Sequence, residues 1–387
     1  MMVFLQMYPI RNMKYLFTFI ILILSLPLAT HAQSGLVADQ QAYEKARVLE
    51  VLAQHTDIIP GTDTPATSQT LRALILDGPE AGRTISFEND YTQLDAGDVF
   101  YARHLTNDID GTDIWSVADP YRLNVLLILT VAFVALIFIF GGVQGVRGLA
   151  SLVGSLILIF WLLVPGIYSG YSPILVSIGV ASLIIIVGSY ITHGFNRTTS
   201  AAVIGMIVTV IVTGAAAYFF MHAANLSGYT SDENVYLNFD TRGRIDMIGL
   251  LFGGIMIGLL GVLYDSAIGQ AIAIEELFRA GSHMTRWHVY RRGIRIGREH
   301  IGALVNTLAI AYVGASLPLL LLIQSSDSDI LFILNSEIFA TEIVRILIGS
   351  IGLVLAVPIT TLIATYMLSE KYAVTHDTGG HGHAHTH

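Results

Sequence analysis

The stretch GLLFGGIMIGLLGVLYDSAIGQAIAIEE, residues 249–276, decides the fold of this chain. It has the apolar length of a membrane helix, which needs about 20 residues to cross a hydrocarbon core of about 30 Å. Asp265 stands within it among residues that are almost all apolar or small. A charged group at such depth is costly and by default marks a functional site. The stretch therefore predicts a membrane helix that carries a functional acid.

One face of this expected helix collects its small residues and its acid. Positions three and four residues apart return to the same side of a helix. That side holds Gly254, Gly258, Gly261, Asp265, Gly269, Ile272 and Glu276. Small residues let neighbouring helices approach closely in lipid. We therefore expect this face to pack on other helices and to turn Asp265 into a bundle rather than toward lipid.

The composition of the whole chain agrees with a membrane protein. Of its 387 residues, 53% are hydrophobic and only 13% are charged, with a mean hydropathy of +0.65. Soluble domains carry about 25% charged residues. There are no cysteines, which excludes a disulfide framework and a thiolate metal site. None of the three lysines stands in a glycine-rich phosphate loop, so we expect no ATP site and no cofactor.

The first 32 residues have the pattern of an export signal. Arg11 and Lys14 precede the apolar run 15–28, and small residues lead to a candidate cleavage point before Gln33. The alternative is an uncleaved first membrane span. Either interpretation sends the following segment across the membrane.

Residues 33–121 are expected to form a small, mainly β extracytoplasmic domain. Strand patterns broken by turn residues occur at 47–52, 71–76, 84–87 and 99–105, which fits a β-sandwich or a barrel. This segment holds 15 acids against five bases, whereas the net charge of the chain is -9. Such an acidic domain argues against nucleic acid as a partner.

Seven apolar segments follow between residues 122 and 368, each long enough to cross a membrane as a helix. They run approximately over 123–141, 146–165, 172–190, 200–221, 247–268, 301–323 and 346–367. Nine basic residues lie on one set of alternate connections and the tail, against three on the other set. The positive-inside rule places the first set in the cytoplasm. The expected fold is thus a polytopic α-helical protein of the plasma membrane, with its amino-terminal domain outside and its carboxyl tail inside.

Asp265 has candidate partners on the next span. It lies about 14 Å from the inner end of its helix, and Asn306 and Thr307 enter about 10 Å from the same side. A carboxylate, an amide and a hydroxyl at one level could coordinate a cation or orient a proton. Two alternatives remain open. Asp265 could be a solvated acid at the interface, and Asn306 could join two helices.

Other residues offer weaker signals. Pro318 and Pro358 interrupt apolar segments and predict either kinks or freed carbonyls. Glu342 and Arg345 have the spacing of a structural ion pair. The loop 277–300 carries Arg291, Arg295 and Arg298 at steps of four and three. It could be a basic helix lying on anionic lipid, or simply reflect the positive-inside bias.

The carboxyl tail, residues 369–387, is rich in histidine. His381, His383, His385 and His387 alternate with small residues, and imidazoles at this density can capture a divalent metal. The glycines among them favour loose capture over a fixed site. A solvated end without metal is the alternative.

Several separated motifs resemble those of the YibE/F-like family of multi-span membrane proteins. They are Leu259 to Asp265 with Glu276-Leu277, Thr192-His193-Gly194-Phe195, Gly297-Arg298 with Asn306-Thr307, and Ile333 to Glu337 followed by Ile343 to Pro358. The resemblance covers about residues 120–368 and implies a shared bundle. Members are commonly described as candidate permeases, and the resemblance implies no substrate. The family usually shows an apolar residue after the aspartate and Ser in place of Gly269, whereas Ser266, Gly269 and Gln270 make this turn more polar here.

These features favour a permease or secondary transporter of an ion or small solute, with a pathway near Asp265, Asn306 and Thr307. The alternative is a membrane sensor or assembly protein that uses the outer acidic domain as a binding module. We do not expect an enzyme, because the chain has no HExxH pair, no GxSxG serine elbow and no second intramembrane acid to pair with Asp265. Substrate, energy coupling and any oligomeric state stay open at this point.

Overall fold

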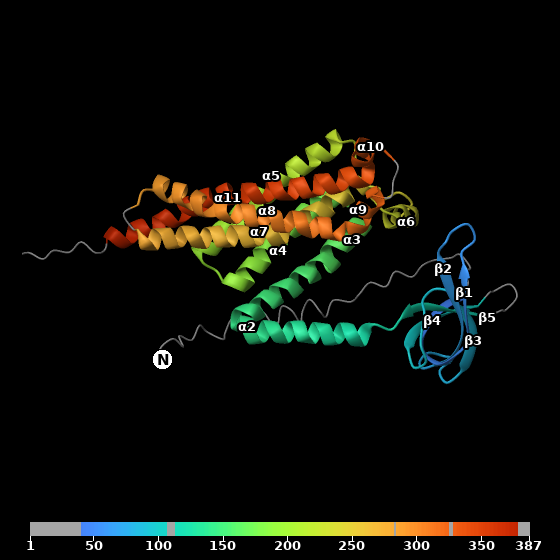
Figure 1. Cartoon of the computed structure of the whole chain (residues 1–387). Helices are drawn as coiled ribbons and strands as arrows, with labels where there is room; N and C mark the ends of the chain where they lie inside the picture. The colour runs from blue at the N-terminus through green and yellow to red at the C-terminus, as the bar shows by residue number, and fades with distance from the viewer. Residues whose placement is uncertain (1–39, 107–112, 282–283, 325–327, 378–387) are drawn as a thin grey trace, which may run out of the picture. The chain divides into compact units, whose positions relative to one another are not determined.

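The computed structural model describes residues 40–106, 113–281, 284–324 and 328–377. The expected signal 1–32 and the four histidines of the tail lie outside these residues. The chain divides into two compact units, one before and one after the boundary between Leu136 and Ile137. Each unit is described separately below (Figure 1).

The first unit contains a small antiparallel sheet, as the sequence predicts. Its strands are β1 (Gln40–Ile58), β2 (Pro65–Ile75), β3 (Thr84–Asn89), β4 (Val99–Thr106) and β5 (Asp113–Pro120), in the order β3-β2-β1-β4-β5. The two edge strands β3 and β5 contact each other, so the sheet curls into a barrel. All four expected strand segments lie in strands. The fifth strand was missed, although its half-buried Trp115 and buried Val117 lie at alternate positions, with the exposed Ile114 beside Trp115.

Alternating side chains of these strands fill one core. Ala46, Val48, Leu71, Phe87 and Phe100 are among its buried members. Near one end of the barrel, a bond of 2.9 Å joins the His104 imidazole to the Asp113 carboxylate, across the base of the β4–β5 connection. Hydrogen bonds from His104 and then from Thr106 hold the pKa of the Asp113 carboxyl below its ordinary value.

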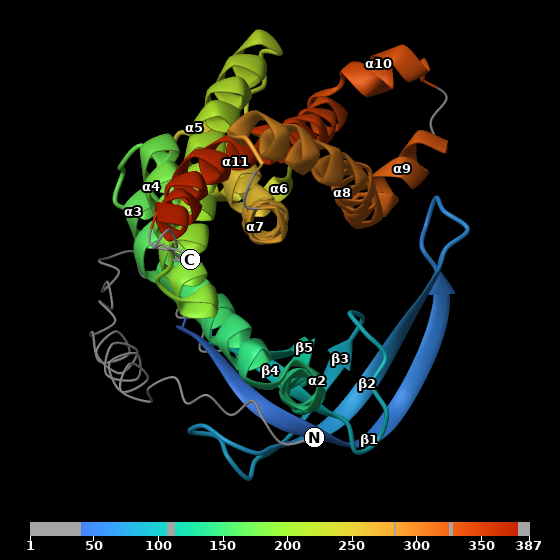
Figure 2. The same cartoon turned by 90° about the vertical axis from the view of Figure 1, so that its left-hand side faces the viewer.

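The second unit is helical. Its elements, starting with a helix that begins in the first unit, are α2 (Leu123–Leu158), η1 (Ile159–Leu163), α3 (Val164–Tyr168), α4 (Pro173–His193), α5 (Arg197–Ala223), α6 (Asp232–Asp240), α7 (Met247–Ala280), α8 (Arg286–Ala315), α9 (Leu317–Gln324), α10 (Ile330–Asn335) and α11 (Glu337–Asp377). The helices α5, α7 and α11 contact one another, α4 covers α5 and α7, and α8 packs on α7 and α11. Figure 2 looks along these helices and shows α7 beside α11, between α4 and α8.

Among the residues that the structure describes, five helical segments are long and apolar enough to cross a membrane, or six if the bent pair of α8 and α9 forms one span. The two expected segments 123–141 and 146–165 fall in one continuous stretch, Leu123–Tyr168. Gly142 interrupts this stretch with a non-helical backbone (φ 51°, ψ -141°), a conformation that favours glycine. The expected boundary between the two segments therefore coincides with a real break.

Two prolines that the sequence singled out behave differently. The helix breaks at Ser316, just before Pro318, and α9 turns by 66° from α8. Pro318 has no N–H to bond the carbonyl four residues earlier, and its ring crowds that carbonyl, which accounts for the break. Pro358 instead lies inside α11, which continues to Asp377. Of the two expected kinks, only the one at Pro318 divides a helix.

The loop expected at 277–300 is much shorter than predicted. The helix α7 continues to Ala280 and α8 already begins at Arg286. Thr285 caps α8 by accepting a hydrogen bond from the amide of His288. The basic segment is therefore the first half of the α8 helix and not a separate helix lying on its own.

Candidate functional site

The face of α7 that carries Asp265 is exposed in this chain. Each of the seven residues predicted to share it, from Gly254 to Glu276, has an exposed surface. The prediction that this face packs inside the bundle is therefore wrong for the single chain. The opposite side, with Phe252, Leu259 and Leu263, is buried. The bulky apolar side chains on this side make many close contacts with the neighbouring helices.

The buried side of α7 also carries polar groups. The Gln270 side chain, 3% exposed, donates hydrogen bonds to the carbonyl of Gly293 at 2.8 Å and to the Thr361 hydroxyl at 2.7 Å. One amide thereby joins α7, α8 and α11. Two glycines of α8, Gly293 and Gly297, make room for this crossing, since a Cβ at Gly297 would lie 3.0 Å from the Gln270 Oε1 atom. A half-satisfied amide here would be costly, so the three helices hold a fixed register.

The structure does not join Asp265 to its expected partners. Asn306 and Thr307 are exposed on α8, and the Thr307 hydroxyl bonds the carbonyl of Ala303 on its own helix at 2.9 Å. Within the described residues, no hydrogen bond links either of them to Asp265. Gly258 lies against Tyr312, because a Cβ there would be 2.7 Å from the Tyr312 hydroxyl. The pathway near Asp265 remains a prediction.

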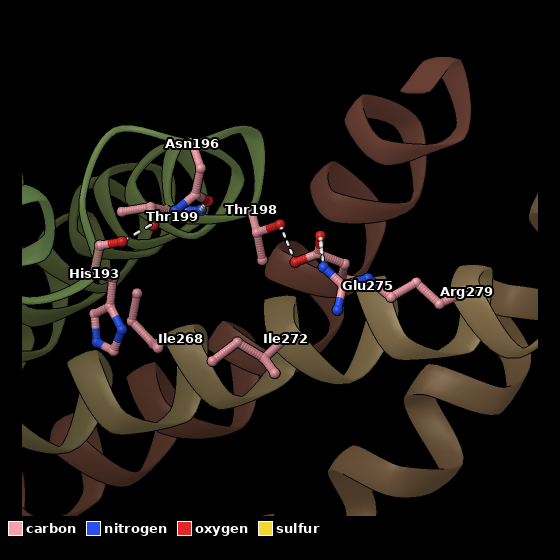
Figure 3. Close-up of a pocket in the computed structure, with 8 residues that line it drawn as sticks. All are labelled: His193, Asn196, Thr198, Thr199, Ile268, Ile272, Glu275 and Arg279. Atoms are coloured by element: carbon pink, nitrogen blue, oxygen red, sulfur yellow. Dashed lines mark hydrogen bonds and ion pairs between the residues drawn. The ribbon is translucent and has the colours of Figure 1, made fainter. Parts of the chain in front are cut away.

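A pocket of about 310 Å³ lies nearby, between the α4–α5 turn and the last turns of α7 (Figure 3). It is lined by His193, Asn196, Thr198, Thr199, Ile268, Ile272, Glu275 and Arg279. Two of these side chains, His193 and Glu275, are titratable near neutral or mildly acidic pH. The pocket brings together a carboxylate, an imidazole, an amide and hydroxyl groups.

The sequence around the α4–α5 turn explains how the pocket forms. Gly194 ends α4 with φ 76°, and the Asn196 side chain then caps α5 by accepting a bond from the Thr199 amide at 2.8 Å. The Asn196 amide group donates back to the carbonyl of His193 at 3.1 Å. This tight reversal places His193 and Thr198 on the side that faces α7, as Figure 3 shows.

Glu275 closes the pocket from the side of α7. Its carboxylate accepts a hydrogen bond of 2.5 Å from the Thr198 hydroxyl and pairs with Arg279 at 2.9 Å. The Glu275 side chain is 14% exposed, whereas that of Glu276 is 61% exposed and contacts only the same arginine among the contacts described. Sequence reasoning named Glu276 and missed Glu275. One residue on a helix is a rotation of about 100°, and this decides which acid meets α5.

An aromatic contact leads from the pocket toward Asp265. The rings of His193 and Tyr264 lie 6.1 Å apart, and the Tyr264 hydroxyl donates to the carbonyl of Gly188 at 3.2 Å. Tyr264 is the residue before Asp265. Two acids of α7, Asp265 and Glu275, therefore lie on the helix that His193 of α4 approaches. In the described part of the chain, no three His, Asp or Glu side chains gather closely enough to hold a metal ion.

The structure also locates the predicted ion pair of Glu342 and Arg345, and the residues Arg298 and Pro358. The ion pair of Glu342 and Arg345 is confirmed at 2.8 Å, and the Ser316 hydroxyl at the α8–α9 break lies 3.4 Å from the Glu342 carboxylate. Arg298 is exposed on α8. Pro358 follows Val357, whose side chain meets Gly297 and whose carbonyl accepts a bond of 2.6 Å from Thr361. Pro358 thus belongs to the region of the Gln270 crossing rather than to the pocket.

Comparison with known proteins supplies the family. The family model described as YibE/F-like protein matches residues 129–370, which contain the second unit from its start at Ile137 as far as Glu370. No curated protein and no solved structure gives a significant match. The matched segment holds both α7 faces, the Gln270 crossing and the pocket. It covers well over half of the chain, and the protein therefore belongs to the YibE/F-like family.

Proposed function

We propose that this protein is a secondary transporter, or permease, of an ion or small solute in the plasma membrane. The observation that carries the proposal is the pocket lined by His193 of α4 and Glu275 of α7, where Glu275 lies about ten residues, or roughly 15 Å, along α7 from Asp265. Chains of Asp, Glu and His within membrane helices are typical of ion and proton pathways. The chain has no nucleotide motif, so coupling to an ion gradient supplies the energy.

Seven crossings account best for the helix lengths. The stretch Leu123–Tyr168 has 46 residues, about 69 Å as a helix, which is more than twice the thickness of the hydrocarbon core. The break at Gly142 turns it into two spans. With α8 and α9 as one bent span, the count is seven. An odd number puts the β domain and the carboxyl tail on opposite sides of the membrane, and the distribution of arginines supports a cytoplasmic tail.

The pocket forms the inner mouth of the pathway in this proposal. If α7 enters the membrane near Met247, about 20 residues bring it to the inner boundary near Ala267. Glu275 then lies about 12 Å beyond that boundary, within reach of cytoplasmic water. Asp265 lies inside the hydrocarbon region. We assign the inner end of the pathway to Glu275 rather than to Glu276, because Glu275 lines the pocket.

A reconstituted flux assay tests the proposal. Purified protein in liposomes is screened for transport of protons, monovalent cations and divalent metals. We expect Asp265→Asn to abolish flux and Glu275→Gln to reduce it about tenfold, since each removes a charge from the pathway. Glu276→Gln is the matched control, because it changes the neighbouring acid with the same Arg279 partner, and we expect nearly full flux.

Two outcomes would contradict this assignment. Flux that survives Asp265→Asn unchanged would place the pathway elsewhere. An absence of flux with every ion tested, together with capture of a partner by the outer domain, would favour the sensor or assembly role. Removal of residues 376–387 tests the tail separately, and unaltered metal uptake would exclude it from transport.

A further inference from the structure

We propose that the arginine row of α8 binds the phosphate groups of anionic phospholipids at the cytoplasmic boundary of the membrane. The row consists of Arg291, Arg295 and Arg298, which recur at steps of four and three residues and are all exposed. The proposal requires that α8 crosses the bilayer. It does not depend on what, if anything, the protein transports.

Packing on the opposite side of α8 fixes the side of the helix to which the arginines of the row point. Val289 is fully buried, and Gly293 and Gly297 approach α7 and α11 so closely that a side chain would not fit without displacement. The Gln270 bond to the Gly293 carbonyl adds a polar restraint. Because these contacts hold α8 at one rotation, the three arginines of the row point away from the bundle.

No described residue neutralises the charges of the row through an ion pair. Arg279 pairs with two glutamates, Arg345 pairs with Glu342, and Arg286 bonds the Ser369 hydroxyl at 2.8 Å. In contrast, the arginines of the row form no ion pair with any residue that the structure describes. Guanidinium groups in this state bind phosphate oxygens well, because their planar donors match the geometry of phosphate.

Depth identifies the lipid as the source of phosphate. The apolar part of α8 begins near Ile301, so Arg298 lies about 4.5 Å, Arg295 about 9 Å and Arg291 about 15 Å before it. A head-group layer is roughly 5–7 Å thick on each side of the core. Arg298 therefore stands in this layer, and Arg295 reaches it with its long side chain. Arg291 lies beyond it.

This upright placement differs from a basic helix that lies flat on the membrane. Because α8 runs without interruption from Arg286 to Ala315, its basic half continues the direction of the span. A flat helix would present all three arginines to the lipid equally. In an upright helix, the contribution of each arginine to lipid binding falls from Arg298 to Arg291.

Native mass spectrometry of the full-length protein in neutral detergent tests the proposal. Phosphatidylglycerol and phosphatidylcholine are titrated in separate series, and the apparent Kd of the first bound lipid is measured. We expect Arg298→Gln and Arg295→Gln each to weaken phosphatidylglycerol binding about fivefold, and the double variant about 25-fold. Binding of phosphatidylcholine should be weaker and unchanged by these variants.

Arg292→Gln is the matched control. Arg292 is exposed on the same helix but about 100° from the row, where it approaches the Met284 sulfur at 3.3 Å. Arg292→Gln and Arg291→Gln should each change the Kd for phosphatidylglycerol less than twofold. Thermal unfolding of each variant verifies that the fold is intact, which we expect because all of these side chains are exposed.

Four results would overturn the proposal or its upright geometry. Equal binding of the two lipids would remove the role of the anionic head group. An unchanged Kd in the double variant would remove the role of the row. Displacement of phosphatidylglycerol by glycerol phosphate at similar concentration would identify a soluble phosphate as the ligand. A fivefold effect of Arg291→Gln would support lipid binding by a flat helix and reject the upright placement proposed here.

Discussion

The two faces of α7 have similar residue types, but one face is buried and the other is exposed. One face holds Gly253, Ser266 and Gln270 and is buried against α4, α8 and α11. The other holds Gly258, Gly261 and Asp265 and is exposed. Both combine glycines with a polar side chain. The difference is that Gln270 meets partners on two neighbouring helices, whereas Asp265 meets none of its expected ones. A small-residue pattern alone therefore does not identify the packing face of a helix.

The largest effect should come from crowding the buried crossing. Gly293→Leu would force a side chain against Ile274 and Thr361 and separate Gln270 from the Gly293 carbonyl. We expect a loss of about 3 kcal/mol in the free energy of unfolding, from overpacking and one broken hydrogen bond. Gly302→Leu on the same helix is the control, because Gly302 is exposed with open space around its Cα.

Thermal unfolding in detergent measures both variants. A marked fall in Tm for Gly293→Leu and a small change for Gly302→Leu would confirm that α8 docks through its glycines. Equal falls in the Tm of the two variants would mean that the exposed side of α8 is covered as well.

Removing the buried amide should have the second largest effect. Gln270→Ala leaves the Gly293 carbonyl and the Thr361 hydroxyl without this donor, although Thr361 keeps its own bond to Val357. We expect a loss of about 1–3 kcal/mol. Asn306→Ala removes an exposed amide from α8 and should cost less than about 0.5 kcal/mol. Unfolding in denaturant compares the two, and a larger cost for Asn306 would reverse the assignment of faces.

Much of this fold could be predicted from the sequence. Apolar runs located the long helices, turn residues located four strands, and the gap between the expected segments 123–141 and 146–165 coincides with the break at Gly142. These signals are local, because they depend on hydropathy and backbone preference within a few residues. The resemblance to the family also led to the correct membership.

The candidate site could be predicted only in part, because it depends on contacts between distant segments. The choice between Glu275 and Glu276 is set by where Thr198 stands, 77 residues earlier. The sequence offered a sign in the polar Ser266 and Gln270, which depart from the family pattern and lie on the buried side. A partner for Gln270 on α8 or α11 could not be inferred from periodicity, because periodicity gives a direction on one helix and no neighbour.

A third, smaller effect distinguishes a threonine that bonds a neighbouring helix from one that bonds its own helix. Thr198→Val removes the donor that α5 offers to Glu275, at a cost of about 1 kcal/mol, because a partly buried carboxylate loses one of its partners. Thr307→Val removes only a bond to the carbonyl of Ala303 on its own helix, and we expect little change. Chemical denaturation of the two variants in parallel gives the difference. Similar values would show that the Thr198 bond adds nothing to the docking of α5 on α7.

The smallest effect concerns the exposed face itself. Gly261→Ala adds a methyl group where nothing lies within 4 Å, so the gain in helix propensity should stabilise the single chain by about 0.5–1 kcal/mol. At Gly253 the same change would bring the Cβ within 2.5 Å of the Ser177 hydroxyl and should destabilise it. Both variants are best measured twice, in detergent as monomers and in a bilayer. If Gly261→Ala stabilises the protein in both, the face borders the pathway or the lipid. If it stabilises the monomer but destabilises the protein in the bilayer, another helix covers Gly261 there, because a close helix contact is the one setting in which that methyl group would clash.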